Sequence, residues 1–168
     1  MISKVLFAGE GGVGKTSIIR KFLGDGLSRG ITLGVDFHFI RKNNVNIMIW
    51  DFSGQERFKP LIENLFCGAK LLVLVFDLSR PKTLLKLMDW ANYVRSKVDQ
   101  IPVIVVGNKK DLGKKISDKL IQEVLGKLPF KVLGYIETSA LTGENLNELF
   151  NKIATALNSD GHINFPSR

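Results

Sequence analysis

The chain of 168 residues contains little cysteine and no long apolar run. Its one cysteine, Cys67, forms no disulfide within the chain, and we expect it to be a small core residue. The longest apolar stretches, 71–76 and 101–107, fall far short of the ~18 residues that a membrane span needs. The first residues show no secretory signal. We therefore expect a cytoplasmic protein.

Sequence signals for lipid attachment are missing too. The last residues include no cysteine for prenylation, and Ile2 stands where N-myristoylation needs glycine. We expect membrane contact to be peripheral at most and not lipid-anchored, through partners or basic residues. The two histidines, His38 and His162, have no ligand-spaced neighbours, so neither is assigned a catalytic role.

Positive charge exceeds negative charge, with 24 Lys and Arg against 16 Asp and Glu and a net charge of +8. Such a balance suits nucleic acid, an anionic membrane or a phosphorylated ligand. The lysines of 109–131 are spread among apolar residues without an aromatic platform for bases. This placement favours solvated helix faces, and we expect no nucleic-acid partner.

Short β-branched runs alternate with helix-period stretches, which predicts an α/β fold with a mostly parallel six-stranded sheet and helices on both faces. Strands are expected near 2–8, 35–41, 45–51, 70–77, 102–107 and 132–137. The second and third alternate in polarity around Asn43 and Asn44, which predicts an antiparallel hairpin; the other four are expected to be parallel and buried. The length allows one domain, 1–157, followed by a polar tail, 158–168.

A glycine-rich stretch, GEGGVGKTS at 9–17, follows the first predicted strand and precedes a helix. It fits the phosphate-loop pattern GxxxxGK(S/T), in which glycines let backbone N–H groups turn around an anion. Lys15 would reach the β and γ phosphates, and the Thr16 hydroxyl suits Mg²⁺. The predicted phosphate-binding residues are Gly11, Gly12, Val13, Gly14, Lys15, Thr16 and Ser17.

Motifs after two later predicted strands indicate which nucleotide base is bound. In NKKD at 108–111, the Asp111 carboxylate can accept from both N1–H and the amine of guanine, a donor pair that adenine lacks. Asn108 would tie this loop to the phosphate loop, and the stem of Lys109 would lie along the ring. In TSAL at 138–141, N–H groups of Ala140 and Leu141 would meet the guanine oxygen beside Ser139.

The stretch IWDFSGQERF at 49–58 carries the residue types of phosphoryl transfer. Asp51 would hold Mg²⁺ through water, Gly54 would offer its N–H to the γ phosphate, and Gln55 would orient the attacking water. Catalysis would then consist mainly of positioning and electrostatics.

Together these motifs resemble the Ras-superfamily small GTPases, nearest the Rab branch, over about 2–157. The resemblance implies binding of GTP and GDP with Mg²⁺, slow hydrolysis, and two switch segments near 24–36 and 51–66 that change with the γ phosphate. Effectors, exchange factors and GTPase-activating proteins would act through those segments. Thr32 matches the threonine that joins Mg²⁺, and Gly11 and Gln55 match positions whose substitution impairs hydrolysis.

The sequence departs from that pattern in several places. The segment between Thr16 and Thr32 is about two residues shorter than is typical of the family, and within it no aromatic follows Phe22 to cover the guanine. Phe52 stands beside the predicted catalytic glutamine, and Leu141 replaces the usual lysine. Arg29 lies three residues before Thr32, an offset that resembles the built-in catalytic arginine of heterotrimeric G-protein α subunits; a solvated loop arginine is the alternative.

Three functions remain open from the sequence. The first is a hydrolysing molecular switch, the second a GTP-binding interaction module with negligible hydrolysis, and the third a basic nucleic-acid or lipid binder that uses nucleotide for structure.

Overall fold

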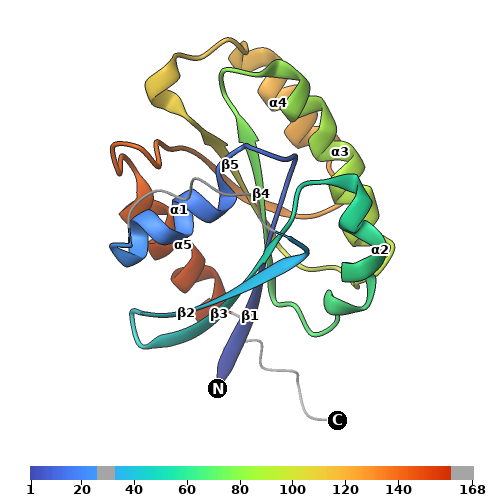
Figure 1. Cartoon of the computed structure of the whole chain (residues 1–168), viewed down its shortest axis with the longest axis vertical. Coiled ribbons are helices and arrows are strands. Elements are labelled where there is room, and N and C mark those ends of the chain that lie inside the picture. Colours follow the sequence, from blue (N-terminus) through green and yellow to red (C-terminus); the bar gives the residue numbers. More distant parts are fainter. Residues whose placement is uncertain (26–32, 160–168) are drawn as a thin grey trace.

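The computed structural model describes residues 1–25 and 33–159 (Figure 1). Within these residues, six strands form one sheet in the order β2-β3-β1-β4-β5-β6. The strands are β1 (Ile2–Ala8), β2 (Val35–Lys42), β3 (Val45–Phe52), β4 (Leu71–Asp77), β5 (Val103–Asn108) and β6 (Val132–Glu137). The longer helices are α1 (Lys15–Leu23), α3 (Pro81–Arg95), α4 (Asp118–Lys127) and α5 (Leu146–Ser159), and shorter turns of helix are η1 (Glu56–Phe58), α2 (Lys59–Ile62), η2 (Glu63–Leu65) and η3 (Lys110–Leu112).

The predicted hairpin and the predicted parallel strands are confirmed. β2 and β3 pair antiparallel around Asn43 and Asn44, whose φ angles of 49° and 62° are those of a tight hairpin turn. The remaining neighbours in the sheet, from β3 across to β6, all pair in parallel. Parallel strands need crossover connections, and the helices supply them.

Helices cover both faces of the sheet, so the core has two layers (Figure 1). Alternate residues of β4 point to opposite faces: Leu72, Leu74 and Phe76 join the side chains of α3 and α4, whereas Leu71, Val73 and Val75 join those of α1 and α5. Every residue of β4 is buried, as expected for a central parallel strand.

The structure corrects two expectations about burial. β6 is only partly covered, with Ile136 its one buried residue, because it is the edge strand of the sheet. Cys67 is exposed rather than part of the core, because it lies in the turn before β4 and its neighbour Phe66 fills the core position instead.

The ends of the described chain bear on the predicted tail. α5 continues to Ser159, two residues past the expected domain end, and 160–168 lie outside the described residues. Between 109 and 131 the lysines are exposed apart from the half-buried Lys109, which confirms the solvated faces. In the described ranges, no helix has the length and apolar character that a membrane span requires.

Candidate nucleotide-binding site

The predicted site residues follow the carboxyl ends of strands. The loops after β1, β3, β5 and β6 hold the four predicted motifs, and because these strands are parallel their ends lie at one edge of the sheet. The fold thus brings together residues that are more than a hundred positions apart in the sequence. Thr32 and Arg29, predicted for metal binding and catalysis, lie outside the described residues.

Two of its glycines show why the phosphate loop requires this residue. Gly12 and Gly14 have φ angles of 75° and 100°, the left-handed region that other residues avoid. A Cβ on Gly14 would also lie 2.3 Å from the Asn108 amide nitrogen. Gly14 caps α1 without a side chain, so the loop leads directly into the helix N-terminus, which favours an anion.

Lys15 lies inside this loop and is only 5% exposed. Its Nζ donates to the carbonyl oxygens of Gly9 at 2.9 Å and Glu10 at 3.0 Å. Burial lowers the pKa of Lys15 to about 8, although the negative charges of Asp51 and Glu10 act in the opposite direction. A buried ammonium with this environment is suited to bind a charged phosphate.

Two of the three candidate Mg²⁺ ligands, Thr16 and Asp51, lie within the described residues and contact each other. The Thr16 hydroxyl donates to Asp51 Oδ2. Asp51 is fully buried, and its Oδ1 has no hydrogen-bond partner among the described residues. Burial raises the pKa of Asp51, while the bond from Thr16 and the charge of Lys15 oppose the rise. A hydroxyl beside an unsatisfied carboxylate oxygen is a donor set that fits Mg²⁺ and its water ligands.

His38 has companions that its sequence neighbours did not suggest. On β2, Asp36 and His38 point to the same face as Asp51 on β3, and the ligand atoms of the three lie within 4.8 Å of one another. His38 Nε2 is buried, lies 4.0 Å from Asp51 Oδ2, and has no hydrogen-bond partner in the described part of the chain. The antiparallel register, which pairs Asp36 with Asp51, was the signal for this cluster.

Asn108 joins three loops. Its Nδ2 donates to the Val13 carbonyl of the phosphate loop at 2.9 Å, and its Oδ1 accepts from the Thr138 hydroxyl at 3.0 Å and the Ala140 amide at 3.2 Å. The structure therefore has the tie between loops that the sequence suggested. In this arrangement the Ala140 amide, expected at the guanine oxygen, is engaged by Asn108 instead.

Asp111 and Lys109 are also held by their surroundings. Asp111 Oδ1 accepts from the Ser139 hydroxyl at 2.5 Å, which fixes the carboxylate relative to the loop after β6. Lys109 has a φ of 63° and its Nζ lies 3.3 Å from Asp77 Oδ2. Leu141 is 56% exposed at the rim of this loop.

The loop after β3 lies against the phosphate loop. A Cβ on Gly54 would lie 2.3 Å from both Glu10 C and Gly11 N, so the two backbones are in direct contact. Gln55 Cγ is 3.8 Å from the position of a Cβ on Gly11. The Phe52 side chain points to the face of the sheet that α3 and α4 cover. It is fully buried there and packs edge-on against Phe66, with 4.9 Å between the ring centroids.

Two residues at the carboxyl end of β4, Asp77 in the strand and Arg80 just after it, were not predicted and contact the site. Asp77 Oδ2 accepts from Arg80 Nε at 2.9 Å, and Arg80 Nη2 donates to the Gly11 carbonyl at 3.2 Å. Burial acts to raise the pKa of Asp77, but hydrogen bonds from Ser79 and Arg80 and the charge of Lys109 outweigh it and keep that pKa below its ordinary value. The stretch DLSR at 77–80 ends a strand as the other motifs do, which was the available signal.

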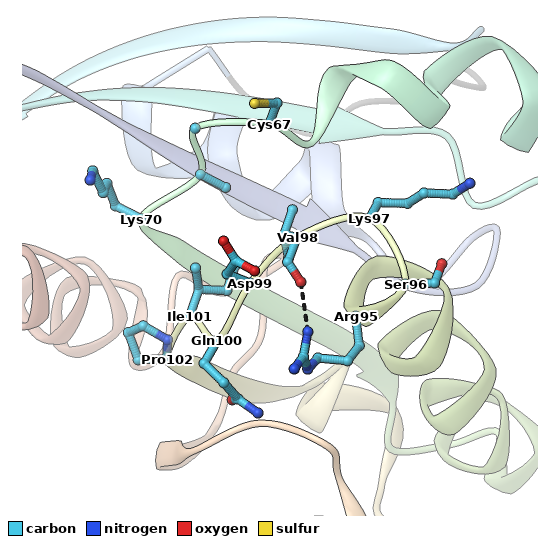
Figure 2. A pocket seen from close by; sticks show the side chains of 12 residues that line it. Cys67, Lys70, Arg95, Ser96, Lys97, Val98, Asp99, Gln100, Ile101 and Pro102 are labelled. Carbon is cyan, nitrogen blue, oxygen red and sulfur yellow. Dashed lines mark hydrogen bonds between the residues drawn. The ribbon is translucent and has the colours of Figure 1, made fainter.

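A cavity of about 660 Å³ lies at the amino ends of the parallel strands, opposite the candidate site (Figure 2). It is lined by 67–70 and 95–102, the segments that lead into the amino ends of β4 and β5. Figure 2 shows Arg95 donating to the Val98 carbonyl, a bond of 2.8 Å that closes the turn after α3. None of the motif residues lines this cavity, which is therefore separate from the candidate site.

The sheet order and the loops at its carboxyl edge define the fold of a Ras-like P-loop GTPase. A family model described as the Ras family matches residues 4–159, and the chain belongs to that family. Ras-family proteins are small GTPases that act as molecular switches and generally bind GTP, GDP and Mg²⁺.

Proposed function

We propose that this protein is a switch that binds GTP and GDP with Mg²⁺ and hydrolyses GTP to GDP and phosphate. The observation that carries the proposal is the set of bonds around Asn108, which holds the phosphate loop and the loop after β6 against the loop that contains Asp111. One side chain thus joins the loop predicted to bind phosphate to the loops predicted to bind guanine. The motifs GVDF at 34–37 and WDFSGQERF at 50–58 favour a Rab-like member of the family.

In the proposed reaction, water attacks the γ phosphate in line with the leaving oxygen. Gln55 orients that water, while Lys15 and the amides of 11–17 and Gly54 hold the phosphate charge. Thr16 would hold Mg²⁺ directly and Asp51 would hold it through water, with Thr32 as the further family position; the ion would neutralise phosphate charge. Arg29, which the sequence analysis suggested, is the candidate for an arginine of this same chain that stabilises the transition state.

The base is proposed to be read by Asp111, oriented by Ser139, with Lys109, Ala140 and Leu141 around the ring. A carboxylate that accepts two guanine N–H donors would be left unpaired by adenine, which rejects ATP strongly. Calorimetry with GDP and Mg²⁺, together with identification of the nucleotide released on denaturation, tests the assignment directly.

Asp111→Asn gives the sharper test. We expect this variant to lose at least about a hundredfold in affinity for GDP and to prefer xanthosine diphosphate, because the amide can donate to the carbonyl that xanthine carries in place of the amine. Asp118→Asn is the matched control, since Asp118 is an exposed carboxylate on α4. No GDP uptake by the unaltered protein, or an unchanged base preference in Asp111→Asn, would contradict the proposal.

Partners are proposed to dock on the switch segments and on the strand beside them. Phe37 and Phe39 are 54% and 52% exposed on β2, an edge strand. Phe37 contacts Trp50 edge-on at 4.7 Å, which gives this edge a preformed aromatic surface. Exposed aromatics next to a nucleotide-sensitive segment suit effectors, exchange factors and GTPase-activating proteins.

The alternative is a GTP-binding module that hydrolyses negligibly. Two features of the sequence favour it: Phe52, or the segment between Thr16 and Thr32, which is about two residues shorter than is typical of the family, would misplace the attacking water. Phe52 packs in the core against Phe66, which removes the first reason, whereas part of the shortened segment lies outside the described residues. Phosphate release followed over hours, with and without a partner protein, separates the two functions.

A further inference from the structure

Arg80 contacts the phosphate loop from the neighbouring strand end, and the sequence analysis did not predict this contact. It follows β4, which lies next to β1 in the sheet, so the two strand ends are neighbours. Its Nη2 donates to the Gly11 carbonyl at 3.2 Å and would lie 3.4 Å from a Cβ on Gly12. Its positive charge also lowers the pKa of Lys15, although burial is the larger cause.

The guanidinium is held in place by Asp77. That carboxylate is 1% exposed, accepts from Arg80 Nε at 2.9 Å, and is itself fixed by the Ser79 amide at 2.8 Å and hydroxyl at 2.6 Å. Because guanidinium is planar, a bond at Nε fixes the direction of the Nη donors. Asp77 thus aims Arg80 at the phosphate loop, and the same carboxylate pairs with Lys109.

The peptide that joins Gly11 to Gly12 transmits this contact. It is trans, like the other peptide bonds of the described residues, so its carbonyl and its N–H point in opposite directions. With the Gly11 carbonyl turned toward Arg80, the Gly12 N–H points away from the guanidinium. A cation on the carbonyl also strengthens the N–H of the same peptide as a donor, since hydrogen bonds in a chain polarise one another.

We propose that Arg80 is a positioning residue: through the Gly11–Gly12 peptide, it aims and polarises the Gly12 N–H toward a phosphate oxygen of the bound nucleotide. The inference depends on the proposed GTP and GDP binding. Preorganised N–H donors contribute most where charge develops during phosphoryl transfer, so the effect is expected on hydrolysis as well as on binding.

The test compares Arg80→Ala and Arg80→Lys with Lys82→Ala. Lys82 is an exposed lysine that lines the same hollow of about 350 Å³ beside Gly11, so its removal is a matched loss of charge. In Arg80→Ala we expect GDP to dissociate about tenfold faster and single-turnover hydrolysis to fall roughly tenfold or more. Arg80→Lys should recover part of both, because charge remains while the planar fork is lost.

A spectroscopic readout separates positioning from a general loss of stability. The Gly12 amide proton of the GDP-bound protein should shift upfield in Arg80→Ala and remain in place in Lys82→Ala, as followed by ¹H–¹⁵N correlation spectra. If Arg80→Ala matches Lys82→Ala within twofold in both rates, or leaves the Gly12 resonance unchanged, the proposal is overturned. Absence of GDP uptake by the unaltered protein would overturn the proposed function too, and calorimetry distinguishes that failure.

Discussion

Raising the pH from 7 to 8.5 should weaken GDP binding through Lys15. The pKa of Lys15 is lowered to about 8 by burial, so near pH 8 the side chain is half protonated. Phosphate oxygens beside Nζ favour the charged form and return the pKa toward its ordinary value of about 10.4. Binding then takes up roughly 0.5 proton at pH 8 and about 0.8 proton at pH 8.5. The same linkage predicts a loss of about fourfold in affinity between pH 7 and 8.5.

Titration calorimetry in buffers of different ionisation enthalpy measures that proton uptake. The observed binding enthalpy at pH 8.5 should vary with the buffer, with a slope equal to the number of protons taken up. Lys15→Arg is the matched control, because arginine stays protonated throughout this range and its slope should be near zero. A slope near zero in the unaltered protein would refute the argument that burial without phosphate depresses this pKa.

Three substitutions test the packing, two near the site and one in α4. Gly54→Ala would force a Cβ to within 2.3 Å of the phosphate-loop backbone, so GDP affinity should fall roughly tenfold or more and stability by about 1–3 kcal/mol; urea unfolding and calorimetry measure both. Gly126→Ala in α4, where a Cβ meets nothing within 4 Å, should instead raise stability by up to ~1 kcal/mol. Phe52→Ala should cost about 3–5 kcal/mol in urea unfolding through loss of its contact with Phe66, and a cost under about 1 kcal/mol would contradict its core role.

The strands and the phosphate loop could be predicted because their signals are local. Alternation of polarity around Asn43 and Asn44 specifies the hairpin within about fifteen residues, and the glycines before Lys15 specify a loop that only they can form. The tie from Asn108 was predicted from the motif NKKD at 108–111, although its partner lies far away in the sequence. Its bonds cross ninety-five positions of sequence to Val13.

Other features depend on which strands become neighbours in the sheet, and no local pattern of the sequence indicates the strand order. Arg80 reaches Gly11 because β4 pairs with β1, and His38 meets Asp51 because the hairpin register puts both on one face. Phe52 is next to Asp51 in the chain yet faces the opposite layer, because successive side chains of a strand alternate. Adjacency in sequence therefore overstated its influence on Gln55.

The polar side chains that join the loops predict that binding and stability are coupled in this site. Asn108 and Asp77 are each 1% exposed, and a buried polar group is costly unless its partners are in place. Asn108 meets that requirement only while the phosphate loop and the loop after β6 are closed around it, and Asp77 only while Arg80 and Ser79 donate to it. These bonds thus hold the loops that carry the predicted nucleotide-binding residues, so a substitution of Asn108 or Asp77 is expected to lower both the nucleotide affinity and the free energy of unfolding.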